Sequence, residues 1–441
     1  MALGAVLEPL IVVSLLVFGT IVNRNKISGA NSGLPLSSTR PEPWQHLKYA
    51  ADHEINDDVE RGRAREDELT LLPPPLSRSS SSSSDTLMDD VSAKTAPRWR
   101  KRRLRCLGWE KEVTTPNTEI FKDRFLSRVL QRFPFLVEVW YWALIYWVYQ
   151  LGRAFTAVTL QESTVNTARE HGLQVIHAEQ ALGLFVEPAV QQWFLERPTL
   201  MRWTNKTYSF IHIPGTILYL IILYHITIAR PQHKLLQEER YRDGSDGDRP
   251  TTLKNWRERA PAFGPPIYER RRRTMAMCNL LAFIVFTFWP CMPPRLLSDP
   301  TYTGENSEEA KGYGFVDTVH GADGDSSVWT TNRFCNQYAA MPSLHFGYSF
   351  LIGLTIAAVP LLRNKRKSLL SLGGRRTLII AAGMVYPVII LTAIVATANH
   401  YVLDAVAGAV ACIVAWMCND VLLNLVPLED YFLAALRIHK P

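Results

Sequence analysis

Long apolar runs, separated by polar segments, recur along most of the chain. A membrane-spanning helix needs about 20 mostly apolar residues, and seven runs approach or exceed that length. They lie near residues 5–22, 135–158, 208–228, 275–292, 347–362, 378–398 and 402–426. This pattern predicts an all-α polytopic membrane protein, with an N-terminal anchor helix and a core of six transmembrane helices.

The same pattern divides the chain into four regions. Residues 1–23 form the anchor, which we interpret as uncleaved because it lacks the basic start and the clear cleavage site of a signal peptide. Residues 24–130 are polar, Ser-rich and basic, without periodicity over most of their length, and we expect a disordered cytosolic segment. Residues 131–427 form the six-helix membrane domain, and 428–441 form a cytosolic tail.

Six cations cluster at the end of the polar segment: Arg98, Arg100, Lys101, Arg102, Arg103 and Arg105. In a soluble protein such a cluster is typical of nucleic-acid binding, but beside a membrane bundle it favours contact with anionic lipid. We therefore expect no nucleic-acid partner. Whether a regulatory protein binds this cytosolic segment is an alternative that the sequence leaves open. The six cysteines lack zinc-site spacing, so the sequence predicts no metal site and no disulfide framework.

The loop charges predict the orientation, because Lys and Arg accumulate on the cytosolic side of a membrane. Segment 229–274 is rich in Lys and Arg, and 363–376 is basic without any acid. Segment 293–342 instead carries three cations against seven acids, so we expect it to face the lumen of the Golgi or endoplasmic reticulum, together with 159–207. The sequon at Asn205 lies on that side, close to the membrane.

Cys291 and Cys335 flank this acidic loop. A lumenal loop lies in an oxidising compartment, where disulfides persist. Two alternatives stay open: a bridge that closes the loop, or two free thiols.

Two histidines come to the lumenal side under this topology. "MPSLH" (341–345) ends in His345 at the start of the fifth core helix, and "NHYVLDAVAG" (399–408) contains His400. Asp404, four residues after His400, shares its helical face and can fix the imidazole tautomer. A lone interfacial histidine is often only an amphipathic side chain, but ionisable groups that converge in a membrane bundle are expensive unless they are used.

Three other residues, Pro342, His177 and His212, lie at or near the predicted lumenal side. Pro342 precedes a helix start whose free N–H groups suit a phosphate. His177 and His212 have no partner visible in the sequence, and we interpret both as structural.

The two histidine motifs resemble the signature motifs of the type 2 phosphatidic acid phosphatase and haloperoxidase superfamily. "PCMPPRLL" (290–297) and "AEQALGLFVEPAVQQWFL" (178–195) resemble its inositol phosphorylceramide synthase branch, an inositolphosphotransferase, in its fungal form. The resemblance implies a six-helix phosphatase-type core and metal-independent transfer through a phosphohistidine, without a cofactor. It implies His400 as nucleophile, Asp404 as its orienting base and His345 as general acid, with Ser343 and nearby amides on phosphate oxygens.

The sequence departs from the phosphatase pattern of this superfamily at three positions, two of which are cationic in that pattern. Leu223 stands at the lysine position, and Ala393 and Ile394 stand where the pattern has Ser-Arg. We therefore expect other groups to bind the phosphate. The candidates are Arg295 first, then Arg153 and Arg333, with Asn399 beside the nucleophile.

Three function classes follow. The first is a lipid phosphotransferase of sphingolipid metabolism, which moves a phospho-headgroup such as inositol phosphate from a phospholipid to a lipid alcohol such as ceramide at the lumenal face. The second is a phosphatase of lipid phosphates or isoprenoid diphosphates, in which water is the acceptor. The third is a non-catalytic assembly or lipid-sensing protein. Haloperoxidase chemistry would need a dense cationic vanadate pocket, which the sequence does not contain.

Overall fold

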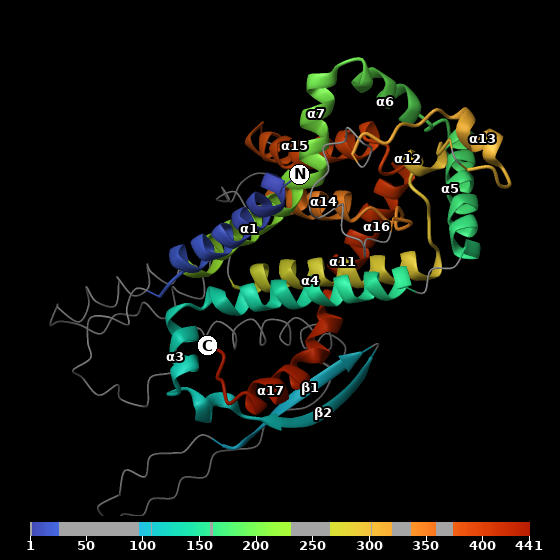
Figure 1. The fold of residues 1–441 in the computed structure, drawn as a ribbon. Helices are drawn as coiled ribbons and strands as arrows, with labels where there is room; N and C mark the ends of the chain where they lie inside the picture. Colours follow the sequence, from blue (N-terminus) through green and yellow to red (C-terminus); the bar gives the residue numbers. More distant parts are fainter. Residues whose placement is uncertain are drawn as a thin grey trace, which may run out of the picture. The chain divides into compact units, whose positions relative to one another are not determined.

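The computed structural model describes residues 2–25, 97–106, 108–158, 162–230, 265–300, 302–319, 337–358 and 374–441. This part of the chain is mostly helical and contains one two-stranded sheet (Figure 1). The seven predicted apolar runs all fall on helices. These helices are α1 (Ala2–Val22), α4 (Phe135–Val158), α8 (His212–Tyr224), α11 (Pro265–Phe288), α14 (Leu344–Ala357), α15 (Gly374–Ala396) and α16 (Val402–Cys418).

Three helical stretches among the described residues are long and apolar enough to cross a membrane: Pro198–Ala229, Gly374–Ala396 and Val402–Ala435. They support an integral membrane protein, whereas the six-helix core and the compartment stay predictions. The first stretch is continuous from α7 (Pro198–Lys206) through α8, with two π-helical turns, η2 (Thr207–Ile211) and η3 (His225–Ala229). Such turns are rare inside α-helices and are frequent at functional sites.

The expected disorder of 24–130 is wrong for its last part. Strands β1 (Trp99–Cys106) and β2 (Trp109–Pro116) form an antiparallel hairpin, followed by η1 (Thr118–Phe121) and α3 (Phe125–Arg132). The strand was missed because β1 has no alternation of apolar and polar residues: Arg100 to Arg103 are four consecutive basic residues, followed by Arg105. Residues 26–96, which include the serine run, lie outside the described residues.

The hairpin is fixed to the rest of the protein by a carboxylate in α17 (Val426–Ala435). Arg102 donates from Nε and Nη2 to the two oxygens of Asp430, at 2.8 and 3.0 Å, and Thr115 Oγ1 lies 2.8 Å from the same group. The predicted tail 428–441 therefore begins inside a helix that packs on the hairpin. Lys101 and Arg103 pair with Glu112 across the strands, and a lipid contact of the basic cluster stays a prediction.

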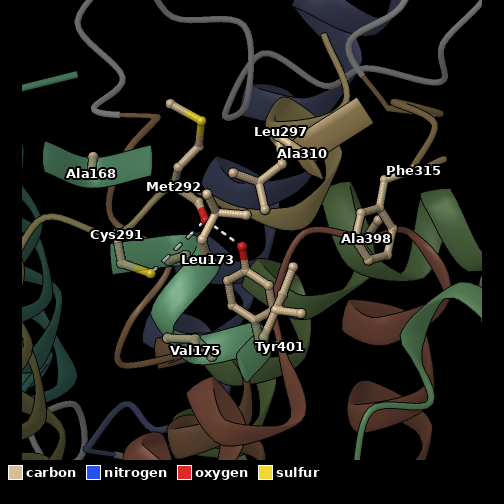
Figure 2. Close-up of a cluster of buried hydrophobic side chains, with 12 residues drawn as sticks. Ala168, Leu173, Val175, Cys291, Met292, Leu297, Ala310, Phe315, Ala398 and Tyr401 are labelled. Atoms are coloured by element: carbon tan, nitrogen blue, oxygen red, sulfur yellow. Dashed lines mark hydrogen bonds between the residues drawn. The ribbon is translucent and has the colours of Figure 1, made fainter. Parts of the chain in front are cut away.

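Four further helices cover the end of the bundle at which α14 and α16 begin, which we call the site end (Figure 1). They are α5 (Glu162–Leu182), α6 (Glu187–Leu195), α12 (Pro294–Leu297) and α13 (Ser307–Gly312). Buried side chains of α5, α12 and α13 pack around Tyr401, whose hydroxyl donates to the carbonyl of Met292 at 2.9 Å (Figure 2). Cys291 in this cluster is a free, buried thiol, and Cys335 lies outside the described residues.

The first turns of α14 and α16 touch through glycine. The backbone of Ser343 lies against Gly408 so closely that a Cβ at 408 would overlap the Ser343 carbonyl oxygen. A Cβ at Gly347 would lie 3.2 Å from the carbonyl oxygen of Gly408. In addition, Ser343 N–H donates to the carbonyl of Asp404 at 3.0 Å. This approach brings His345 and His400 to the same place.

Replacing Gly408 by alanine is expected to force the two helices apart. Overpacking of this kind costs about 1–3 kcal/mol, so Gly408→Ala should lower the unfolding temperature in detergent and reduce any activity that needs both histidines. Gly312→Ala is the matched control, because a Cβ there meets no atom within 4 Å. Equal unfolding temperatures for the two variants would contradict this packing.

Candidate active site

A cavity of about 310 Å³ extends from the site end into the bundle. At the site end its walls include Tyr208, His212, Arg295, His345, Asn399 and His400. Further along, α4, α8 and α11 supply mainly apolar side chains, and the far end contains the ion pair of Glu138 and Arg272, with a contact of 2.7 Å. Both predicted catalytic histidines therefore face one largely apolar cavity.

His400 lies in the short turn between α15 and α16 and is only 6% exposed. Its Nδ1 lies 2.8 Å from the carbonyl oxygen of Ala340 and 3.4 Å from Oδ2 of Asp404. Both neighbours are acceptors, so the hydrogen-bond pattern assigns the proton to Nδ1. The lone pair of Nε2 is then the nucleophilic one, and either neighbour stabilises positive charge on the ring.

Asp404 has two functions at the start of α16. Its side chain is fully buried, and Oδ2 accepts the backbone N–H of Tyr401 at 3.0 Å, which caps the helix. A carboxylate in the first helical turn is stabilised by the helix dipole. The predicted orienting function is therefore shared, because the Ala340 carbonyl lies closer to the imidazole than Asp404 does.

His345 lies in the first turn of α14, with its ring centroid 5.8 Å from that of His400. Tyr208 stacks on His345 at 4.5 Å, and the ring of His212 lies 4.9 Å away. His212 in turn has Nδ1 3.0 Å from the hydroxyl of Tyr386. These aromatic side chains restrict the orientation of His345.

The position of His212 was missed from the sequence, where it had no visible partner. Tyr208 lies in the π-helical turn η2, and His212 follows at the start of α8. A π-helical turn shifts the face on which the next residues point. The spacing of four residues between an aromatic residue and a histidine was the available signal, but it does not show which helix they contact.

Arg295 and Asn399 form one polar unit beside His400. The Arg295 side chain is 5% exposed, donates from Nε to Oδ1 of Asn399 at 2.9 Å and from Nη1 to Oδ2 of Asp317 at 2.8 Å. Its backbone N–H donates to the carbonyl of Ala398, which has a positive φ of 50°. Arg295, the first candidate for phosphate binding in the sequence analysis, thus lies at the cavity, and Asp317 partly offsets its charge.

Ser343 occupies the N-cap of α14. Its Oγ accepts the N–H of Phe346 at 3.4 Å, and the residue is fully buried. The side chain therefore supports the helix start whose N–H groups were predicted to bind phosphate oxygens.

Two predicted phosphate ligands are not located. Arg153 belongs to α4 but its side chain lies outside the described residues, and Arg333 lies outside them entirely. His177 pairs with Glu309 at 2.6 Å on the surface and does not line the cavity. Within the described ranges, no cluster of three or more His, Cys, Asp or Glu side chains has the arrangement of a metal site.

Two imidazoles that line one cavity can act as nucleophile and general acid in a substitution at phosphorus. One forms the bond to phosphorus, and the other donates a proton to the leaving oxygen. A guanidinium beside them binds the equatorial oxygens. The geometry therefore suits group transfer from a phosphate ester with a long apolar part.

Arg295→Lys is expected to weaken phosphate binding, because an ammonium cannot contact Asn399, Asp317 and a phosphate oxygen in one plane. Hydrogen bonds to charged groups contribute about 1.5–3 kcal/mol, so the loss in kcat/KM should be roughly 10- to 100-fold. Arg202→Lys, on the exposed side of α7, is the matched control. Unchanged kcat/KM in Arg295→Lys would remove Arg295 from the phosphate site.

Comparison with known proteins agrees with this geometry. A family model described as the PAP2 superfamily matches residues 173–235 and 262–418, a range that contains both histidines, Asp404 and Arg295. No curated protein and no solved structure matches the chain.

Proposed function

This chain belongs to the PAP2 superfamily, whose members act on phosphate esters as phosphatases or phosphotransferases, and we propose that it is a lipid phosphotransferase. The donor is a phospholipid such as phosphatidylinositol, and the acceptor is a lipid alcohol such as ceramide. The supporting observation is the pair of imidazoles 5.8 Å apart on an apolar cavity that also contains Arg295.

The reaction begins with attack of His400 Nε2 on the phosphorus of the donor. The bond from phosphorus to the diacylglycerol oxygen breaks, and His345 protonates that oxygen. The phosphohistidine still carries the headgroup, and the positive charge on its ring is stabilised by Ala340 and Asp404, which lie 2.8 and 3.4 Å from Nδ1. The acceptor hydroxyl then loses its proton to His345, attacks phosphorus and releases His400.

The charge of the site supports a phosphodiester donor. The described walls at the site end contribute one guanidinium, Arg295, which is already paired with Asp317. Ala393 and Ile394, which stand where the phosphatase pattern has Ser and Arg, are buried in α15 at 2% and 0% exposure. A phosphodiester carries one negative charge, whereas a phosphomonoester carries nearly two. Weak positive charge therefore favours transfer from a diester over hydrolysis of a monoester.

The apolar cavity supports a lipid acceptor. Its wall beyond His345 includes Leu220, Ile213 and Phe286, and apolar surface of this kind is stabilised when a hydrocarbon chain replaces water. We further propose that the site faces the lumen of the Golgi or endoplasmic reticulum; the loop charges support the non-cytosolic side of the membrane.

The direct test is a transfer assay. Purified protein is incubated with phosphatidylinositol labelled in the headgroup, with and without ceramide. The proposal requires labelled inositol phosphorylceramide that forms only with ceramide. Release of water-soluble inositol phosphate alone would indicate a hydrolase. Phosphatidate is tested separately as a substrate for a lipid phosphatase. If neither product forms and phosphatidate is not hydrolysed either, the result would contradict an enzyme of this class.

The two histidines are expected to differ in their response to the leaving group. Loss of a general acid costs about 10²–10⁴-fold in rate, and His345→Ala should regain much of this with a donor whose leaving group is nitrophenol, because such a group needs no proton. His400→Ala should stay inactive with both donors, since the nucleophile is missing. His177→Ala is the control. Equal recovery of the two site variants would contradict these assignments.

The orientation is tested by labelling single cysteines from the cytosolic side, in a variant without the exposed Cys418. A cysteine at Ser245 should react with an impermeant reagent in sealed vesicles of cytosolic-side-out orientation. A cysteine at Glu308 should react only after the membrane is opened. The reverse pattern would contradict a lumenal site.

A further inference from the structure

Two glutamates that are fully buried meet the first turn of α16, immediately after His400. Glu179 comes from α5, and its Oε1 accepts the N–H of Leu403 at 2.7 Å. Glu187 comes from the first turn of α6, and its Oε1 accepts the N–H of Val402 at 2.9 Å. With Asp404 on the N–H of Tyr401, three carboxyl groups take three successive backbone donors.

Three ionised carboxylates in this dry space would repel one another strongly. The N-terminus of a helix offers the equivalent of only about half a positive charge, and burying an uncompensated charge costs several kcal/mol. The other oxygens of Glu179 and Glu187, Oε2 in each, have no donor from the described protein groups. A proton shared between these two oxygens removes one charge and satisfies both atoms.

The surroundings agree with a retained proton. Burial, and then the hydrogen bond to Glu187, raise the pKa of Glu179 to about 9. The titratable groups that face Glu179 are Glu187 from α6, Asp404 and Tyr401 at the start of α16, and Cys291 after α11. None of these groups carries a positive charge that would favour the ionised form, and the negative charge of the neighbouring carboxylates favours the protonated form of the pair.

We propose that Glu179 and Glu187 are positioning residues that share one proton and clamp the first turn of α16, so that His400 is held against Ala340 and Asp404. This inference rests on the proposed function of His400. The turn that carries His400 contains Ala398 with a positive φ, a conformation that costs free energy for a residue with a Cβ. Anchoring Val402 and Leu403 keeps this turn in place.

Both glutamates lie in the segment 178–195, whose resemblance to the synthase branch carried no assigned function. The proposed clamp assigns a positioning function to these two carboxyl groups. It connects the helices that cover the site end to the nucleophile through backbone hydrogen bonds, without either glutamate touching the substrate cavity.

Single and double glutamine variants test the shared proton. In Glu179→Gln the amide oxygen still accepts from Leu403 and the amide N–H donates to Glu187, so this variant imitates the protonated partner. Glu187→Gln does the same in reverse. In the double variant two N–H₂ groups face each other without an acceptor, and buried donors without a partner are destabilising.

The expected kinetic result separates these variants. Each single variant keeps kcat within about threefold of wild type, whereas the double variant loses about tenfold or more, with KM for phosphatidylinositol changed less than kcat. Glu170→Gln, exposed on the same helix, is the control.

Two measurements do not need activity. An infrared band of a protonated carboxyl group should persist in wild type to about pH 9 and disappear in the double variant. The folded pKa of Glu179 lies above its unfolded value of about 4.3, so folding takes up a proton. The contribution of this carboxyl group to the free energy of unfolding is therefore fully present below about pH 4 and is lost as pH rises towards about 9. In Glu179→Gln the free energy of unfolding should depend less on pH over this range.

Outcomes distinguish this inference from the proposed function. Wild type could transfer no headgroup and still show the infrared band and the pH-dependent free energy of unfolding. That result would support the shared proton of the carboxyl pair and contradict the proposed enzyme function. A double variant as active as the single ones, or a wild type without the protonated-carboxyl band, would overturn the clamp even if transfer is observed.

Discussion

Backbone contact between α14 and α16 controls the geometry of the candidate site. Gly408 allows the carbonyl of Ser343 to lie against α16, and the N–H of Ser343 donates to the carbonyl of Asp404 at 3.0 Å. The two helices consequently begin at one end of the bundle, and each presents a histidine there. His400 is then held by the Ala340 carbonyl, which lies just before α14, so both histidines are positioned by the same junction.

Electrostatic balance at this junction is the basis for the phosphodiester donor that we propose. Carboxyl groups from α5, α6 and α16 occupy the N–H groups of the catalytic helix, while Arg295 is divided between Asn399, Asp317 and the open cavity. The described site thus combines two acceptors beside Nδ1 of His400 with little excess positive charge. That combination suits a singly charged diester, and the apolar cavity suits the lipid parts of donor and acceptor.

Much of this arrangement could be predicted from the sequence, because it depends on periodic or local signals. Apolar run length located the helices, and the four-residue spacing of His400 and Asp404 located the orienting carboxylate. The hairpin at 99–116 was missed because its inward side chain, Arg102, pairs with Asp430 some 328 positions away. The contact of His400 with a backbone carbonyl, and the stacking of Tyr208 on His345, depend on tertiary packing that spacing does not encode.

A covalent intermediate on His400 is the central claim, and trapping it is the most direct measurement. Purified protein is mixed with phosphatidylinositol carrying radioactive phosphorus, without acceptor, quenched in base, digested and mapped by mass spectrometry. The account predicts a base-stable, acid-labile label on the peptide that contains His400, released when ceramide is added before the quench. Efficient transfer to ceramide with no label on His400, or with label on another residue, would contradict it.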